Sequence, residues 1–569
     1  MRKCIPLFIL FFAGLVTQAQ KQYINPVLAG FYPDPSICKV GNDYYLITSS
    51  FAYYPGIPIF HSKDLVGWKQ IGYAMNRPEQ LNLIGAGVSR GLFAPAIRYH
   101  NGLYYITCTL IDKGGNFVVT AKDPHGPWSN PAWLPVDGID PSLFFDDNGK
   151  AYFIYNSIPP DNKSLYSGHR TIRIHEFDAA NLKLTGEEKV LINGGTDLSK
   201  KPVWIEAPHI LKKDGWYYLL CAEGGTGYNH SEVVFRSKNA EGPYVSYENN
   251  PILTQRTLDP KRKDPITTTG HADLVETNDG KWYAVFLGCR PYEDDHYNIG
   301  RETFMTPVEW KDGWPVINPG FEEVQYHYPI LSSRGNKNAS NSFGGNFAWR
   351  DDFNSSKLNY RWQFLRTVTS DWWNLKDKKG FLSLKARPET CGGLLNPSFV
   401  AHRQQHLKCT AATSLNFDPS GEDEKAGMLI FQNEQHYYFL AITHGNIPAG
   451  YSGNTRGYAN YVRLYKSTND SSRMEILASQ PLPENTRENI RLQIRANGKT
   501  YSFYYAYANK PWQLLIDNID GKFLSTKVAG GFVGSVFALY ATAPKKIDSK
   551  AYFDWFEYTG NDEALRPKR

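Results

Sequence analysis

A short segment that recurs five times in the first 320 residues constrains the fold of this chain more than any other feature. Four copies join a small or acidic residue to proline and the fifth lacks the proline; their equivalent residues are Asp34, Ala94, Asp140, Ala207 and Ala272. An aromatic residue follows each of them after 10 to 12 positions, namely Tyr44, Tyr104, Tyr152, Tyr217 and Trp282. This near-constant offset predicts repeated structural units rather than a run of unrelated hairpins.

The residues around each aromatic position indicate a β-hairpin. Turn residues precede it, as in Asn101-Gly102 and Asp214-Gly215, and an alternating apolar strand follows, as at 217–220. The copies are spaced 46 to 67 residues apart, and they show almost no helical periodicity. Repeats of several strands each are typical of propeller blades. The sequence therefore predicts an all-β fold that begins with a five-bladed β-propeller over residues 24–320.

A second domain follows the repeats, because 569 residues exceed what one hydrophobic core usually holds. Residues 332–347 are rich in Ser, Asn and Gly, which is typical of a linker. Beyond them lie short alternating strands at 381–384, 428–431, 436–440 and 501–505. This pattern predicts a β-sandwich over residues 345–560.

The first residues predict a signal peptide over residues 1–19. Arg2 and Lys3 supply positive charge, residues 5–16 are apolar, and Thr17-Gln18-Ala19 places small residues at a cleavage site. No later stretch reaches the length needed to span a bilayer. We therefore expect export to the periplasm or the extracellular space, with no membrane span.

Charge and cysteine content exclude several classes of protein. The net charge is only +6 and the basic residues do not cluster, so nucleic acid is not expected as a partner. Six cysteines remain after the signal peptide, and they form no C-x-x-C pair that would indicate a metal site. Cys391 and Cys409 could form a disulfide in an oxidising compartment, and buried thiols explain the other four equally well.

Four polar residues stand where the innermost strand of a blade begins: Asp34, Asp140, Glu206 and His271. The second blade carries Phe93 at this position. Each polar residue alone has an ordinary structural explanation, such as a turn before proline. Propeller symmetry directs all four toward one axis, however, and burying three carboxyl groups together costs several kcal/mol unless they are paired or solvated. Such a cluster shifts the pKa values of its members apart, which is typical of an active site.

Two carboxyl groups of unlike pKa are sufficient for glycoside hydrolysis. A protonated carboxyl donates to the leaving oxygen, while an ionised one attacks the sugar or activates water. A third carboxylate nearby would raise the pKa of the acid.

Several segments make the chain resemble the family 43 glycoside hydrolases, which include β-xylosidases and α-L-arabinofuranosidases. The segments lie in order along the propeller and are residues 25–27 with 31–36, 140–142, 204–209, 270–273 and 300–304. The second domain is similar to the concanavalin-like domain of the β-xylosidase branch of this family. The resemblance implies an exo-acting, inverting enzyme that takes pentose-containing oligosaccharides or polysaccharides.

The resemblance also implies a role for each acid. Asp34 would be the general base that activates water, Glu206 the general acid, and Asp140 the residue that orients Glu206 and tunes its pKa. Inversion predicts that the carboxyl groups of Asp34 and Glu206 stand roughly 6.5–9.5 Å apart, which leaves room for water.

Five further residues match positions that bind the sugar. Arg301 would hold pentose hydroxyls, Phe51 and Phe93 would form aromatic walls, and Thr226 would be a polar pocket residue. Many relatives carry tryptophan at the position of Phe93. Phe532 resembles an aromatic residue that the sandwich places over the pocket mouth to enforce exo attack, and core packing of a sandwich strand would explain it about equally well.

His271 matches an axial histidine that holds water or helps to bind calcium in some family members. The chemistry requires no cofactor, so calcium is an optional component that His271 would contact indirectly. Nothing in the sequence indicates an oligomeric state.

Three other functions are alternatives to this interpretation. A β-fructosidase-like enzyme would carry an Asn-Asp-Pro-Asn segment and an Arg-Asp-Pro motif, and the chain has neither. An endo-arabinanase often lacks the second domain, and a non-catalytic sugar-binding propeller would not need an intact acid–base pair. β-Xylosidase and α-L-arabinofuranosidase activity both stay open, with release of β-D-xylose, α-L-arabinofuranose or both, and the extended sandwich favours β-xylosidase slightly.

Overall fold

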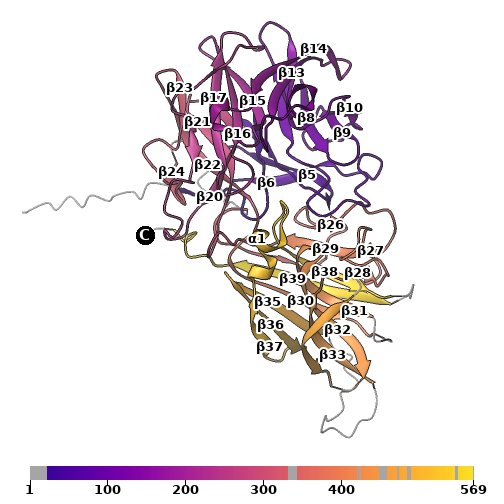
Figure 1. Cartoon of the computed structure of the whole chain (residues 1–569). Coiled ribbons are helices and arrows are strands. Elements are labelled where there is room, and N and C mark those ends of the chain that lie inside the picture. Colours follow the sequence, from indigo (N-terminus) through magenta and orange to yellow (C-terminus); the bar gives the residue numbers. More distant parts are fainter. Residues whose placement is uncertain are drawn as a thin grey trace, which may run out of the picture.

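The computed structural model describes residues 22–330, 343–419, 421, 424–446, 458–470, 473–483, 489–544 and 549–567. It contains a ring of five β-sheets followed by a two-sheet sandwich, so the predicted fold class is confirmed. In Figure 1 the propeller is coloured indigo to magenta and lies above the sandwich, which is orange to yellow. The predicted signal peptide and most of the predicted linker lie outside the described residues.

Each blade is an antiparallel sheet whose strands follow one another in chain order. The first blade holds β2 (Ser36–Val40), β3 (Asp43–Ile47), β5 (Gly56–Ser62) and β6 (Lys69–Met75). The second holds β7 (Ala96–His100), β8 (Leu103–Leu110), β9 (Gly115–Ala121) and β10 (Ala132–Trp133). The third holds β11 (Ile139–Phe145), β12 (Ala151–Ser157), β13 (Thr171–Asp178) and β14 (Lys183–Asn193).

The last two blades complete the ring. The fourth holds β15 (Glu206–Lys213), β16 (Trp216–Glu223), β17 (Ser231–Ser237) and β18 (Val245–Ser246), with β19 (Leu253–Thr254) also paired to β17. The fifth holds β20 (Thr267–Glu276), β21 (Trp282–Cys289), β22 (Glu302–Lys311) and β23 (Trp314–Ile317). The first strands of the five blades contact one another around the ring, so their leading ends converge. Outside the ring, β1 (Gln22–Ile24) pairs with β24 (His327–Pro329).

Turn chemistry explains the near-constant offset seen in the sequence. The two-residue loops Asn101-Gly102 and Asp214-Gly215 have positive φ at both positions (48° and 82°, 50° and 73°), as a type I′ hairpin turn requires. The aromatic residue of each repeat then falls at or near the start of the second strand. Four of these five aromatic side chains are buried, and that of Trp282 is half-buried.

Two large antiparallel sheets form the second domain. One runs in the order β27 (Trp373–Asn374), β28 (Leu382–Lys385), β39 (Lys550–Gly560), β30 (Lys408–Asn416), β35 (Ile490–Asn497), β36 (Thr500–Tyr507) and β37 (Gln513–Asp520), with β25 (Ala348–Asp351) paired to β39. The other runs β34 (Met474–Pro481), β33 (Tyr458–Ser467), β32 (His436–Asn446), β31 (Lys425–Asn433), β38 (Val536–Thr542), β29 (Ser398–Arg403), β26 (Gln363–Leu365) and β4 (Tyr53–Tyr54). Short helical turns lie at η1 (Pro160–Asn162), η2 (Leu198–Lys200), η3 (Lys522–Leu524) and α1 (Thr526–Ala529).

Strand β4 joins the two domains, because it belongs to the first blade in sequence and pairs with β26 of the sandwich. The sandwich therefore continues directly into the segment that carries Phe51. The backbone N–H of Arg366, just after β26, donates to the carbonyl of Ala52 (2.8 Å) and strengthens this junction.

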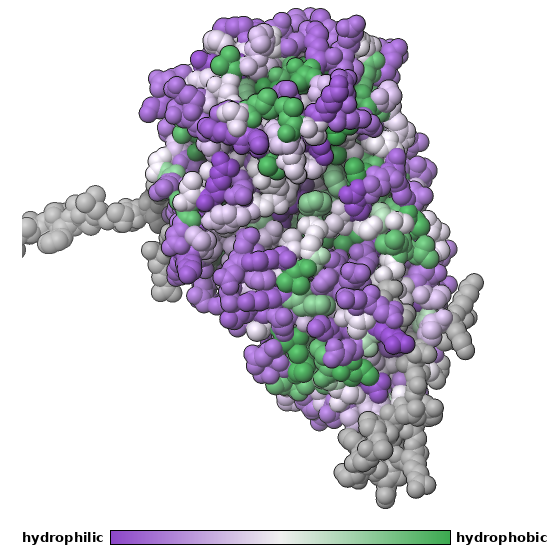
Figure 2. Space-filling model, viewed as in Figure 1, coloured by the Kyte–Doolittle hydropathy of each residue, from purple (hydrophilic) through white to green (hydrophobic). Residues whose placement is uncertain are grey.

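All six described cysteines are free and buried, so the disulfide considered between Cys391 and Cys409 is not formed. The two thiols lie in separate apolar clusters, Cys391 beside Tyr437 and Tyr540, and Cys409 beside Tyr558. Within the described part of the chain no helix is long and apolar enough to cross a membrane. On the face seen in Figure 2, hydrophilic residues predominate and apolar residues gather in separate patches on both domains.

Candidate active site

A pocket of about 720 Å³ opens where the first strands of the blades begin. Its lining includes every site residue predicted from the sequence: Asp34, Phe51, Phe93, Asp140, Glu206, Thr226, His271, Arg301 and Phe532. These residues come from all five blades and from the sandwich. Their convergence is a consequence of the ring closure.

The local backbone turns the polar side chains into the pocket. Asp34, Asp140 and His271 have left-handed φ values of 56°, 53° and 58°, and Ala207 beside Glu206 has 52°. Strand pairing also shifts register at the starts of β11, β15 and β20, which is the signature of β-bulges. A left-handed conformation costs an ordinary L-residue about 1–2 kcal/mol. Residues held in this way often cluster at functional sites, as these do around the pocket.

Asp34 is buried and held as a carboxylate. Arg301 donates to both of its oxygens, with Nη2 3.3 Å from Oδ2, and Ser49 Oγ donates to Oδ2 at 2.5 Å. His271 Nδ1 lies 3.8 Å from Oδ1. Burial alone would raise the pKa of Asp34, but the charge of Arg301, the attraction to His271 when that ring is protonated, and these hydrogen bonds outweigh it and lower that pKa. Asp34 is therefore ionised at neutral pH.

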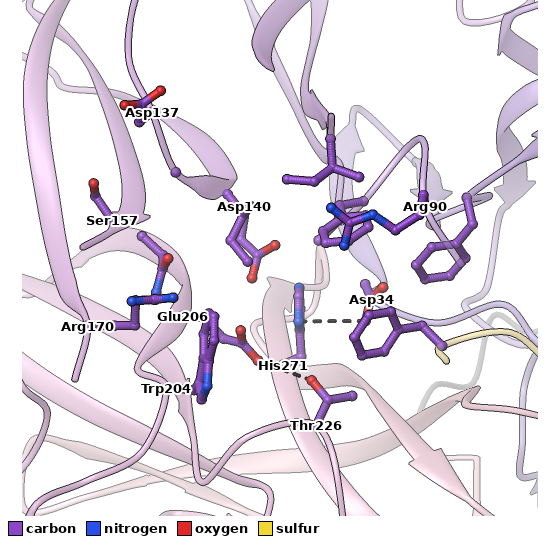
Figure 3. A pocket seen from close by; sticks show the side chains of 18 of the residues that line it. Asp34, Arg90, Asp137, Asp140, Ser157, Arg170, Trp204, Glu206, Thr226 and His271 are labelled. Carbon is purple, nitrogen blue, oxygen red and sulfur yellow. Dashed lines mark hydrogen bonds and ion pairs between the residues drawn. The ribbon is translucent and has the colours of Figure 1, made fainter. Parts of the chain in front are cut away.

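Glu206 and Asp140 have the opposite character. Burial, followed by repulsion from Asp34, raises the pKa of Glu206 to about 7. Burial and repulsion from Glu206 and Asp34 raise the pKa of Asp140 well above its usual value. Thr226 Oγ1 donates to Glu206 Oε1 at 3.4 Å, as the dashed line in Figure 3 marks. Both acids therefore retain their protons to a higher pH than an exposed carboxyl group does.

Three phenylalanine rings form an aromatic wall beside Arg301. The ring centroid of Phe532 lies 6.1 Å from that of Phe51 and 5.9 Å from that of Phe93. The guanidinium carbon of Arg301 lies 5.7 Å from the Phe532 centroid. The backbone N–H of Phe532 donates to Ser89 Oγ at 2.9 Å, which fastens the sandwich segment to the propeller. Phe532 is half-buried in the pocket wall instead of being enclosed in the sandwich core.

His271 is buried, and burial lowers its pKa to about 4. Its imidazole is therefore neutral near pH 7, where Asp34 is ionised and Glu206 can hold a proton. A neutral ring can accept or donate one hydrogen bond to a ligand or water. The described residues contain no cluster of three or more His, Cys, Asp or Glu side chains that could hold a metal ion directly. An indirect calcium contact through His271 stays a prediction.

Sequence reasoning missed several residues of the pocket. Arg90, Asp137, Asn156, Ser157 and Arg170 also line it, and their positions follow no repeat. Trp204 stands two residues before Glu206 and could have been found from that proximity. The role of Ser49 in holding Asp34 had no sequence signal, because it depends on the pairing of β2 with β3.

One ionised carboxyl group, that of Asp34, and two with raised pKa values, those of Glu206 and Asp140, therefore face the same pocket, which an aromatic wall partly closes. This arrangement can supply a base and an acid to opposite sides of a glycosidic bond. The predicted separation of the carboxyl groups of Asp34 and Glu206 stays a prediction.

Comparison with known proteins identifies similar chains over nearly the full length. Residues 23–315 match the family model described as "Glycosyl hydrolases family 43", and residues 350–559 match "Beta xylosidase C-terminal Concanavalin A-like domain". A "Xylosidase/arabinosidase" of Butyrivibrio fibrisolvens is 39% identical, covering 94% of this chain and 98% of that protein. The "Non-reducing end alpha-L-arabinofuranosidase BoGH43B" of Bacteroides ovatus is 36% identical, covering 95% and 96%. The solved structure "Crystal structure of a GH43_12 retrieved from capybara gut metagenome" has a TM-score of 0.84 at 41% identity and covers 93% and 96%.

Proposed function

The chain belongs to glycosyl hydrolases family 43, and from this premise we propose that it is an exo-acting, inverting glycosidase that releases terminal pentoses. The observation that supports this most directly is the contrast between Asp34, which is ionised, and Glu206, whose pKa is raised to about 7, in one pocket. Its expected partners are pentose-containing oligosaccharides or polysaccharides.

Each acid has one step in the proposed reaction. Asp34 accepts a proton from water as the water attacks the anomeric carbon, and Glu206 donates its proton to the leaving oxygen. Burial and the charge of Asp34 hold Glu206 in its protonated range, and Asp140, which accepts a hydrogen bond from the backbone N–H of Ala207 next to Glu206, orients the acid and tunes its pKa. Arg301 keeps Asp34 in place and offers its remaining N–H donors to sugar hydroxyls; its buried Nε has no partner among the described residues.

We propose that both β-D-xylosides and α-L-arabinofuranosides are substrates. A relative that is 39% identical is named "Xylosidase/arabinosidase", and another that is 36% identical is named as an alpha-L-arabinofuranosidase. The two sugars present similar hydroxyl arrangements near the cleaved bond. Phe532 closes one side of the pocket, which supports attack at a chain end over an endo-arabinanase mode.

The test combines substrate and stereochemistry. Purified enzyme should release nitrophenol from p-nitrophenyl β-D-xyloside and p-nitrophenyl α-L-arabinofuranoside. NMR of the first product should show the inverted anomer. Glu206→Ala should lose about 10²–10⁴-fold in kcat/KM on oligosaccharides and less on the aryl glycosides, whose leaving groups need little protonation. The retained aryl glycosidase activity of the variant is the folding control, and full retention of oligosaccharide cleavage would overturn the acid role of Glu206.

We also propose that residues 1–19 direct export and are removed. The support is the charge and hydropathy pattern of that segment alone. N-terminal sequencing of the protein from its native host should begin at or just after residue 20, and an intact Met1 in the mature protein would refute the proposal.

A further inference from the structure

Arg170 and Trp204 form a wall of the pocket that the proposed chemistry does not use. The guanidinium carbon of Arg170 lies 3.9 Å from the centroid of the Trp204 ring, so the cation stacks on the indole. Both side chains are half-buried and line the pocket. In Figure 3 they lie with Glu206, on the side of the pocket away from Asp34.

The hydrogen bonding of Arg170 distinguishes it from the other arginines of the pocket. Arg301 is paired with Asp34, and Arg90 is paired with Asp112. Among the described residues Arg170 forms no ion pair with an acid, and its recorded side-chain bond is to the carbonyl of His169 at 3.3 Å. Burial lowers the pKa of Arg170, although guanidinium remains charged in any protein environment. It therefore keeps N–H donors for a ligand.

The backbone of Trp204 gives a second, independent observation. Its φ is 53°, in the left-handed region that a bulky aromatic residue rarely adopts. A strained residue at a pocket wall points to a functional demand on its side chain. The N–H of Trp204 donates to the carbonyl of Gly168 at 2.8 Å, which ties Trp204 to the loop that carries Arg170.

The geometry of the reaction indicates which part of the substrate contacts Arg170 and Trp204. The general acid must reach the oxygen of the leaving group, so the leaving sugar lies on the Glu206 side, opposite the base. We propose that Arg170 and Trp204 form the binding site for the leaving sugar, a neutral pentose residue of the substrate chain. Arg170 donates hydrogen bonds to the hydroxyls of this sugar, and stacking on Trp204 fixes the orientation of the guanidinium plane.

This inference rests on the proposed function, and binding measurements separate the two. The probes are D-xylose, which occupies the terminal-sugar site, and thio-linked xylobiose, which also reaches the leaving-sugar site but is not cleaved. In wild type the disaccharide should bind more tightly than the monosaccharide. Arg170→Met keeps the apolar stem on Trp204 and removes the donors, so it should lower disaccharide affinity about 10-fold and leave D-xylose affinity unchanged.

Two further variants test whether the effect depends on the guanidinium group of Arg170 and on its place in the pocket. Arg170→Lys should resemble Arg170→Met, because an ammonium lacks the planar fork that stacks and donates in one plane. Arg256→Met removes a half-buried arginine of the fourth blade outside the pocket lining, and should change neither affinity.

The outcomes are distinct. A loss confined to the disaccharide supports the leaving-sugar site. An equal loss for both probes, or no loss for either, overturns it while leaving the proposed function intact. Failure of the wild type to bind D-xylose, together with no cleavage of pentosides, would instead refute the proposed function.

Discussion

The hydrogen bond from Thr226 to Glu206 allows the assignment of the acid to be tested through pH. Thr226→Val replaces the hydroxyl by a methyl group of similar size and removes a donor that favours the ionised form of Glu206. Bonds to charged groups contribute about 1.5–3 kcal/mol at good geometry. At 3.4 Å the bond is long. We therefore expect it to stabilise the ionised form of Glu206 by about 0.5–1 kcal/mol, the lower part of the range for net hydrogen-bond energies.

That energy corresponds to about 0.4–0.7 pKa unit, because one unit equals 1.36 kcal/mol. The acid must hold its proton to act, so kcat/KM on xylobiose should fall above the pKa of Glu206, near pH 7. Losing a bond to the carboxylate raises this pKa further. The alkaline limb of the pH profile should therefore move upward by about 0.4–0.7 unit, and the acidic limb, set by Asp34, should stay.

A matched control exists outside the pocket. Thr196 Oγ1 donates to the carboxyl of Glu223 at 3.2 and 3.3 Å, a similar bond to another largely buried glutamate. Thr196→Val should leave the profile unchanged. An alkaline limb that stays fixed in Thr226→Val, or moves downward, would refute the assignment of Glu206 as the titrating acid.

Three further predictions follow from the walls and supports of the site. Phe532→Ala should raise KM about 3- to 10-fold, because roughly 1 kcal/mol of apolar contact with the sugar is lost, and steady-state kinetics on xylobiose will measure it; an unchanged KM would contradict the role of Phe532. Arg366→Met should lower the free energy of unfolding by about 3–5 kcal/mol, since it leaves the ion-paired Glu434 and the carbonyl of Ala86 without their buried donor. Denaturant unfolding measures this loss, and Arg366→Met combined with Glu434→Leu should recover part of it; no recovery would mean that the stranded charge is not the cause. Dialysis against a chelator should leave activity on p-nitrophenyl β-D-xyloside unchanged, and loss that calcium restores would show that a metal takes part.

Arg366 also shows how the sandwich supports the pocket. Its guanidinium donates to the carbonyls of Ala86 and Leu395 and to Glu434, and Glu434 accepts the N–H of Val88. The segment from Ala86 to Val88 leads directly to Arg90 and Phe93 in the pocket wall. One buried residue of the second domain thus fixes a loop of the first.

The sequence alone was sufficient for the features that adjacent residues encode. Turn pairs such as Asn101-Gly102 and alternating strands set the hairpins, and the repeat of hairpins predicted five blades. Because symmetry directs equivalent positions to the axis, the convergence of Asp34, Asp140 and Glu206 could be predicted without coordinates.

Only the tertiary structure decided the contacts between segments far apart in the chain. It placed Phe532 against Phe51, joined β4 to the sandwich, left Cys391 and Cys409 in separate clusters, and brought Arg170 onto Trp204. Such contacts depend on how whole sheets and loops pack, and no local pattern of turns or alternation records that packing. Local turn and strand patterns determined the hairpins of each blade. The packing of the closed ring against the sandwich determined which side chains line the pocket.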